Sequence, residues 1–205
     1  MYFLAPGWDA ALFTFFNSAR NPLFDALMPI VSMSSLLWII AVLLLGITAW
    51  RGGKRRALEM LVLFGLALVL SDVCAQIIKE FSGRVRPLNF LPGTWYFEDD
   101  IWHQLPQDFV TDKVRGSSFL SAHASNSMAF ALAAVLFWIR FRPWIFILFL
   151  LPLVVGFSRI YLGKHFPSDV LAGWFLGAAL TLTAHAVWLA ARNHLRRGPT
   201  EPVST

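Results

Sequence analysis

The stretch from residue 57 to residue 79 reads ALEMLVLFGLALVLSDVCAQIIK, and it decides the class of fold. A helix of about 20 residues crosses the hydrocarbon core of a bilayer, so this stretch is long enough to do so. Its apolar residues surround the helix instead of forming one stripe, which is typical of a helix in lipid or in a protein core. The stretch therefore predicts a membrane-spanning helix.

Four further stretches share this apolar character, and they cover residues 23–50, 121–139, 143–158 and 167–191. In the first of them, Pro29 and the polar residues at 32–35 predict a break. The whole chain of 205 residues is 57% hydrophobic and 14% charged, whereas soluble domains are about 25% charged. The predicted fold class is an all-α integral membrane protein with about five transmembrane helices.

The rest of the chain is expected to cover or extend this bundle. Aromatic residues mixed with Pro6, Gly7, Asp9 and Asn17 make residues 1–19 an interfacial amphipathic helix, not a span. Residues 80–120 are too long and aromatic for a plain connection, so they predict a structured cap at the headgroup level of the membrane. We expect one membrane-embedded domain over residues 1–195 and a disordered tail over residues 196–205.

The net charge of +5 is interpreted as a signal for membrane orientation, not for nucleic-acid binding. With five spans, three basic connections fall on one side, which the positive-inside rule assigns to the cytoplasm. The cap then faces the outside of the membrane. The basic residues of these connections are Arg51, Lys54, Arg55, Arg56, Arg140, Arg142, Arg192, Arg196 and Arg197.

The first polar cluster lies where the span over residues 57–79 ends. Lys79 is followed by Arg84, Arg86 and Pro87. A separate polar residue, Asp72, shares a helix face with Gln76 and Lys79 because the three are spaced at i, i+4 and i+7. Two interpretations of Asp72 stay open: a polar contact between packed helices, or a partner that positions Lys79.

The second and third clusters lie at the ends of other predicted spans. Ser121, Ala122 and His123 open the span over residues 121–139, where free backbone N–H groups attract anions. A structural role for this histidine and for the small residues around it is equally open. Ser158 and Arg159 precede His165, and Asp169 follows it within the first turn of a helix that begins at Pro167. A carboxylate so placed fixes the imidazole tautomer and makes the other ring nitrogen a better nucleophile.

Together the clusters favour a phosphate site over a metal site. His123, His165 and Asp169 are all zinc ligands by type. However, Lys79, Arg86 and Arg159 repel a divalent cation and attract a phosphate, so no metal or cofactor is expected. An anion transporter is compatible with such a cluster, but the sequence has no internal repeat and no pair of broken helices at mid-membrane.

These residues resemble the type 2 phosphatidic acid phosphatase superfamily, which carries K-x6-R-P, then P-S-G-H, then S-R-x5-H-x3-D. The first motif matches Lys79 to Pro87, and the third matches Ser158 to Asp169 in both residue and spacing. The second is read here as Leu120-Ser121-Ala122-His123, so Leu replaces Pro and Ala replaces Gly. The backbone N–H that Gly offers is retained by Ala.

The resemblance implies metal-independent hydrolysis of a phosphate ester through a phosphohistidine. It assigns His165 as the nucleophile, Asp169 as the group that orients it, and His123 as the acid that protonates the leaving oxygen and later activates water. It assigns the phosphoryl oxygens to five binding groups: Lys79, Arg86, Ser121, Ala122 and Arg159. Preorganised cations suit this chemistry because phosphoryl transfer depends on neutralising charge and on positioning.

The substrate implied is a membrane lipid with a phosphate or diphosphate headgroup. Candidates are phosphatidic acid, phosphatidylglycerophosphate, the 1-phosphate of lipid A and undecaprenyl diphosphate, which family frequency favours. A lipid phosphotransferase with the same intermediate is the alternative enzyme. A catalytically inactive relative is disfavoured because the His, Asp and Arg set is complete. Gly173 and Gly177 are expected to pack within the bundle in preference to forming a dimer, and the sequence leaves the oligomeric state open.

Overall fold

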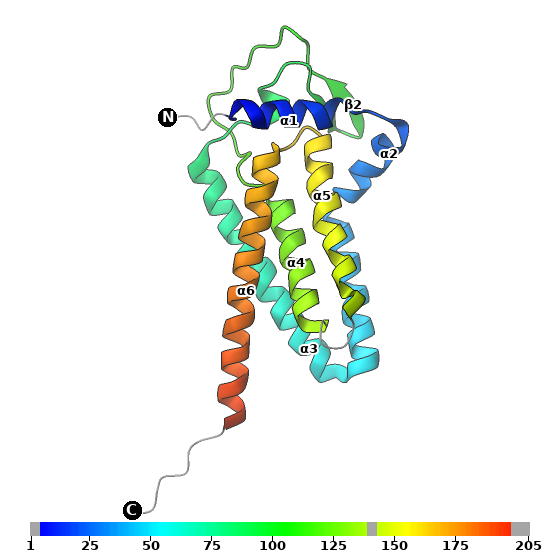
Figure 1. Ribbon diagram of the computed structural model, residues 1–205, viewed down its shortest axis with the longest axis vertical. Coiled ribbons are helices and arrows are strands. Elements are labelled where there is room, and N and C mark those ends of the chain that lie inside the picture. Colours follow the sequence, from blue (N-terminus) through cyan, green and yellow to red (C-terminus); the bar gives the residue numbers. More distant parts are fainter. Residues whose placement is uncertain (1–4, 139–142, 198–205) are drawn as a thin grey trace, which may run out of the picture.

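A computed structural model describes residues 5–138 and 143–197 of the chain, and the side chains of 143–145 and 194–197 are outside that description. Long helices stand side by side in a bundle, and one short helix lies across its end (Figure 1). The helices and strands in chain order are α1 (Gly7–Ser18), α2 (Pro22–Val31), α3 (Ser34–Ser82), η1 (Pro87–Asn89), β1 (Trp95–Glu98), β2 (Ile101–Gln104), α4 (Ala122–Trp138), η2 (Pro143–Phe149), α5 (Leu150–Tyr161) and α6 (Pro167–Arg197).

The long helix α3 consists of two arms that meet at Gly53. This residue has φ 80° and ψ 167°, which are not helical angles, and a positive φ is accessible to glycine without a steric penalty. The chain reverses direction here, at the end of the bundle opposite to α1 (Figure 1). The basic stretch at residues 51–56 therefore lies at the end away from α1.

The predicted break in the first apolar stretch is confirmed. Asn21 caps α2 by accepting a hydrogen bond from the N–H of Phe24 at 2.9 Å, and α2 ends at Val31, two residues beyond Pro29. The first arm of α3 begins only at Ser34. The apolar stretch over residues 23–50 therefore forms two helices, α2 and the first arm of α3.

The remaining apolar stretches fold as helices close to their predicted bounds. Residues 121–139 become α4 and residues 167–191 become most of α6, while residues 143–158 divide into η2 and α5. By length and hydropathy, Ser34–Asn89 and Pro167–Asn193 are candidates to cross a membrane, and Pro22–Val31, Ala122–Trp138 and Phe146–Tyr161 are shorter apolar helices. The count of about five spans stays a prediction. Arg140, Arg142 and residues 198–205 of the predicted tail lie outside the described residues, and α6 continues to Arg197.

The core of the bundle forms around α4, which contacts both α3 and α6. Small residues on α4, among them Ala124 and Ala129, are fully buried. A side chain at Gly173 or Gly177 would overlap the backbone of α4 at Ser121 or Ser125. The prediction that these glycines pack within the bundle is confirmed, because only glycine lets the two helix backbones approach so closely.

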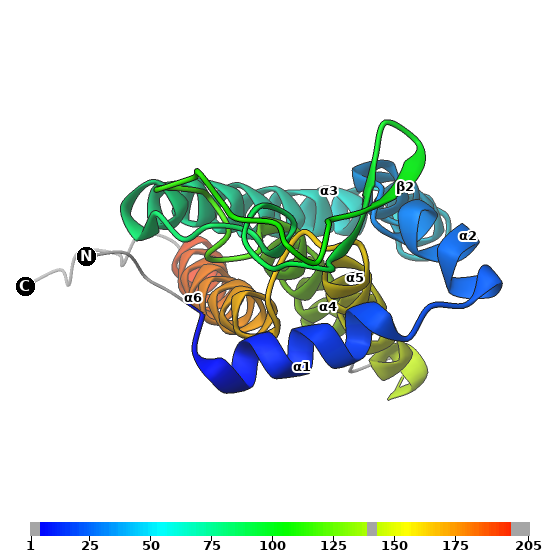
Figure 2. The same cartoon turned by 90° about the horizontal axis from the view of Figure 1, so that it is seen from above.

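The predicted interfacial helix and cap lie over one end of the bundle (Figure 2). Helix α1 buries Asp9, Phe13 and Asn17, which share the face that it turns to the protein. The segment 80–120 contains a feature that the all-α prediction missed: β1 and β2 pair as an antiparallel hairpin. The hairpin is anchored by Trp102, whose ring lies 3.4 Å from the guanidinium carbon of Arg20.

Candidate active site

The three sequence clusters converge at the end of the bundle that α1 and the hairpin cover. The second arm of α3 ends there, α4 and α6 begin there, and α5 ends there (Figure 1). Lys79 is in the last turn of α3 and Arg159 in the last turn of α5. His123 is in the first turn of α4, and Asp169 is in the first turn of α6. The common face predicted for the clusters is therefore confirmed.

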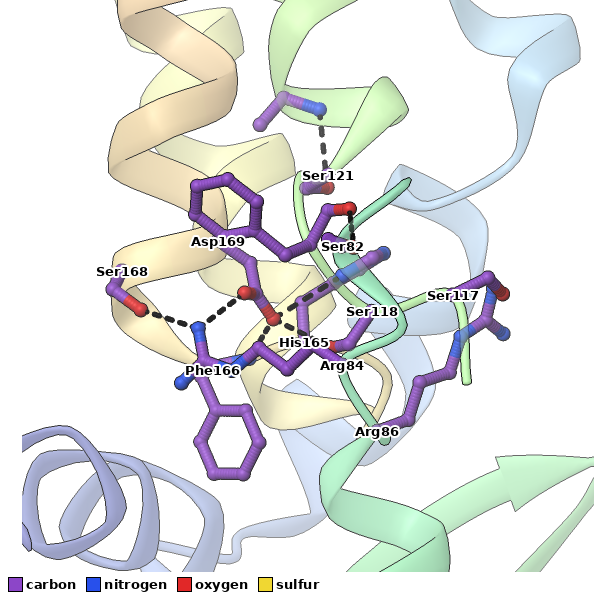
Figure 3. A network of polar contacts seen from close by, with 12 residues as sticks. Ser82, Arg84, Arg86, Ser117, Ser118, Ser121, His165, Phe166, Ser168 and Asp169 are labelled. Atoms are coloured by element: carbon purple, nitrogen blue, oxygen red, sulfur yellow. Dashed lines mark hydrogen bonds and ion pairs between the residues drawn. The ribbon is translucent and has the colours of Figure 1, made fainter. Parts of the chain in front are cut away.

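Asp169 is the best-connected side chain at this end (Figure 3). It is fully buried. Its Oδ2 accepts hydrogen bonds from the Ser118 hydroxyl at 2.6 Å and from the Phe166 N–H at 2.9 Å. Its Oδ1 accepts from the guanidinium of Arg84 at 2.5 Å. One cation and two neutral donors therefore surround this carboxylate.

His165 lies in the turn between α5 and α6 and is 2% exposed. Its Nδ1 is 3.6 Å from Asp169 Oδ2, a distance typical of an ion pair and too long for a hydrogen bond. Burial is the main cause that lowers the pKa of His165 to about 4; the charges of Arg159 and Arg86 act in the same direction, and Asp169 opposes them. The ring is therefore neutral at neutral pH, as a nucleophile must be.

Arg84 and Asp9 complete a buried network that the sequence did not predict. Arg84 bonds Asp169 on one side and makes a short ion pair with Asp9 on the other. Ser168 joins the same group, donating its N–H to Asp9 Oδ1 at 2.9 Å and its hydroxyl to Asp9 Oδ2 at 2.6 Å. Helix α1 is thus connected to the orienting carboxylate through one arginine.

Only a weak sequence signal pointed to these two residues. Arg84 lies inside the variable spacer of K-x6-R-P, and Asp9 is a lone carboxylate in an apolar segment 75 residues away. Charged residues in such surroundings are functional or paired by default. However, these two residues lie in chain segments that meet only in the folded protein, so the local sequence does not show that they pair.

The predicted phosphate ligands surround His123 more loosely. The charges of Arg159, Lys79 and Arg86 all act on its ring. Arg86 approaches the Ser117 hydroxyl at 3.5 Å, and Arg159 donates a short hydrogen bond to Ser32. These cations have few protein acceptors and remain available to an anion.

The start of α4 is capped by a serine. The hydroxyl of Ser121 accepts the N–H of Ala124 at 3.4 Å. Its own N–H donates to the carbonyl of Asp169 at 3.0 Å. Ser118, three residues earlier, donates its hydroxyl to the side chain of Asp169. Ala122 is 7% exposed and lines the groove described next.

Two hollows meet beside Lys79. One is a groove of about 500 Å³ between α3 and α4, lined largely by apolar side chains together with Lys79 and His123. The other is a polar hollow of about 520 Å³ that contains Lys79, Arg86 and Arg115. This arrangement suits an amphiphile whose apolar part lies in the groove and whose anionic part lies among the cations. Among the residues that the structure describes, no group of three His, Cys, Asp or Glu side chains is placed to hold a metal ion.

Asp72 does not pair with Lys79 in the part of the chain that is described. Its carboxylate instead accepts a hydrogen bond from the amide of Asn126 on α4 at 3.3 Å. Of the two sequence interpretations, the contact between packed helices is the one observed.

Comparison with known proteins agrees with this site. A profile of the PAP2 superfamily matches residues 60–193, well over half of the chain. The chain is 29% identical to an undecaprenyl-diphosphatase of Sulfolobus acidocaldarius over 84% of this chain and 74% of the relative. It is 28% identical to a lipid A 4'-phosphatase of Bacteroides thetaiotaomicron over 82% of this chain and 72% of the relative.

Two solved structures share the fold. The crystal structure of Aquifex aeolicus LpxE superposes with a TM-score of 0.70 and 24% identity, covering 91% of this chain and 99% of the other. The transmembrane PAP2-type phosphatidylglycerolphosphate phosphatase of Bacillus subtilis superposes with a TM-score of 0.61 and 25% identity, covering 88% of this chain and 84% of the other. The chain belongs to the PAP2 superfamily, and the enzyme class predicted from its motifs, a membrane phosphatase, is confirmed.

Proposed function

We propose that the chain hydrolyses a lipid phosphate or diphosphate through a covalent phosphohistidine, without a metal ion. The observation that carries the proposal is the buried imidazole of His165, whose Nδ1 lies 3.6 Å from a carboxylate oxygen of Asp169. Asp169 favours the tautomer with the proton on Nδ1, which leaves the lone pair of Nε2 for attack on phosphorus.

The reaction proceeds in two displacements. Nε2 of His165 forms a bond to phosphorus as the bond from phosphorus to the lipid oxygen breaks, and His123 gives that oxygen its proton. A water molecule then loses a proton to His123 and attacks phosphorus, which breaks the P–N bond and releases inorganic phosphate. Lys79, Arg86, Arg159, the Ser121 hydroxyl and the Ala122 N–H stabilise the charge on the equatorial oxygens in both steps.

Charge balance supports the role of His123. In the free protein, the charges of Lys79, Arg86 and Arg159 act on its ring. A bound phosphate brings two negative charges among these cations and offsets their effect. Substrate therefore removes the part of the cost of protonating His123 that these cations cause.

The proposal extends to the membrane. The two arms of α3, together with α4, η2 with α5, and α6, provide five crossings. The basic turn near Gly53 then faces the cytoplasm, and the site and its cap face the periplasm across the inner membrane of a bacterium. Single cysteines at Arg51 and Val110, in a Cys74→Ser background, test this topology by labelling from each side of the membrane.

The experiment that tests the chemistry is phosphate release from a panel of lipid phosphates by protein purified in detergent, in excess EDTA. We expect release by the wild type and none by His165→Ala. Rapid quenching should trap phosphate on the protein in an acid-labile, base-stable form. Release that EDTA abolishes contradicts the metal-free mechanism. A trapped intermediate that forms phosphate only slowly, and that passes to an added lipid acceptor, identifies a phosphotransferase.

A further inference from the structure

The groove between α3 and α4 contains a pair of polar side chains, and Ser34, Gln76, Lys79 and His123 also line it. Asp72 and Asn126 face each other across it, among side chains that include Leu37, Trp38 and Leu68. A carboxylate at this depth in a membrane protein is costly unless it is paired. The pair therefore needs a partner beyond the contact that the two residues make with each other.

Both members of the pair are short of hydrogen-bond donors. Asp72 is exposed to the groove, and its one hydrogen bond among the described residues is the 3.3 Å contact from the Asn126 amide. The other end of that amide, Oδ1 of Asn126, is buried and accepts no hydrogen bond from the described residues. Carboxylate and amide oxygens only accept, so the group that completes this site must donate.

The pair lies at a defined depth below the reacting groups. Asn126 follows His123 by three residues on α4, which is almost one helical turn, and a turn rises about 5.4 Å. Asp72 precedes Lys79 by seven residues, about two helical turns, on the same face of α3. A lipid whose leaving oxygen is at His123 places the atoms nearest to its phosphate beside Asp72 and Asn126.

We propose that this groove selects lipid phosphates that carry a hydroxyl or amide N–H within about one helical turn of the phosphate ester oxygen. Asp72 and Asn126 accept the hydrogen bonds of that donor and act as specificity-determining residues. The inference rests on the proposed function, because it assumes that the lipid lies in the groove while its phosphate is attacked. It disfavours polyprenyl diphosphates, whose chains carry no donor, and diacylglycerol phosphates, whose esters only accept.

The test compares two probes with equal acyl chains: ceramide 1-phosphate, which has a hydroxyl and an amide N–H beside the phosphate, and phosphatidic acid, which has neither. We expect the wild type to prefer ceramide 1-phosphate in kcat/KM by tenfold or more, because a buried acceptor left unpaired by the other lipid disfavours its binding. Asp72→Leu should remove most of that preference. Phosphatidic acid hydrolysis should rise in this variant, since an apolar side chain replaces the unpaired carboxylate.

Two further variants keep the test decisive. Asp72→Asn keeps the size and one acceptor, so its preference should fall between those of the wild type and Asp72→Leu. Glu59→Leu removes a carboxylate from the same arm of α3, where it pairs with Arg55 outside the groove, and should keep the wild-type preference. Equal hydrolysis of both lipids by the wild type, or a preference that Asp72→Leu leaves intact, overturns the inference alone. Failure of the wild type to hydrolyse any lipid phosphate overturns the proposed function and the inference with it.

Discussion

The surroundings of Asp169 and those of Asp72 satisfy a carboxylate in opposite ways. Asp169 is buried, and Arg84, Ser118 and the Phe166 N–H all donate to it. Asp72 faces an open groove and accepts one long hydrogen bond. The first arrangement uses most of the carboxylate's hydrogen-bonding capacity within the protein, which restricts it to one position. The second leaves hydrogen-bonding capacity that a ligand or water can use.

The largest expected effect follows from removing the side chain of His165, which lies beside the buried network. His165→Ala should lower kcat for any lipid phosphate by at least about 10⁴-fold, because the nucleophile is lost and its neighbours cannot replace it. Phosphate release by purified protein measures this. His103→Ala, which removes an exposed histidine from the hairpin, should retain wild-type activity. An active His165→Ala variant contradicts the assignment of the nucleophile.

The next largest effect is expected from a change at Asp9, which lies at the end of the buried network away from His165. In Asp9→Asn, Arg84 loses its ion pair with Asp9 and keeps the one with Asp169, so the guanidinium draws more negative charge from Asp169 and weakens its hold on His165. We expect kcat to fall by about 10- to 100-fold with KM little changed. Losses of this size are typical when a group that orients a metal ligand is removed. Steady-state kinetics separate the two parameters, and a folded elution profile in detergent confirms that the variant is intact.

Two comparisons show whether Asp9 acts through position. Asp9→Glu restores the charge and should recover part of kcat. Asp25→Asn removes a carboxylate that pairs with Arg20 at 2.7 Å, away from Asp169, and should leave kcat near that of the wild type. Equal losses in Asp9→Asn and Asp25→Asn, or a loss in KM alone, contradict a positioning role for Asp9.

A contrast between local spacing and contacts made only in three dimensions explains which parts of the fold and the site were predictable from the sequence. His165, Asp169 and the cations were predictable because their spacing along the chain places them at neighbouring helix ends. Apolar runs likewise predicted α4 and α6, since burial in lipid or core shows directly in composition. Arg84 and Asp9 were not predictable because their partners come from segments that meet only in three dimensions. The β1–β2 hairpin was missed because aromatic residues in a mixed segment are equally typical of a membrane interface.

Acid pH should destabilise the folded protein through His165. Burial lowers the pKa of His165 to about 4, against about 6.5 in an unfolded chain. Between these values the unfolded state binds the proton more tightly, so stability is complete above about pH 6.5 and falls as the pH drops toward 4. Linkage gives a loss of about 2 kcal/mol at pH 5 from this residue. Thermal unfolding in detergent should show a smaller acid-induced decrease in Tm for His165→Gln than for the wild type. Equal decreases contradict the assignment.

The smallest expected effect comes from a change in helix packing that acts on the surroundings of Asp169 and not on those of Asp72. In Gly177→Ala, the new Cβ overlaps the α4 backbone at Ser125, so α6 must move and carry Asp169 with it. Alanine favours a helix over glycine by up to about 1 kcal/mol, but overpacking against backbone opposes this gain by about 1–3 kcal/mol. We expect a net destabilisation of about 1 kcal/mol and a lower kcat.

Gly46→Ala is the matched control, since its Cβ meets nothing within 4 Å, and it should raise Tm or leave it equal. Because Asp72 and Asn126 lie between α3 and α4, lipid preference should persist in Gly177→Ala while turnover falls. If Gly177→Ala loses both lipid preference and turnover, the groove and the buried network are structurally coupled and do not act separately.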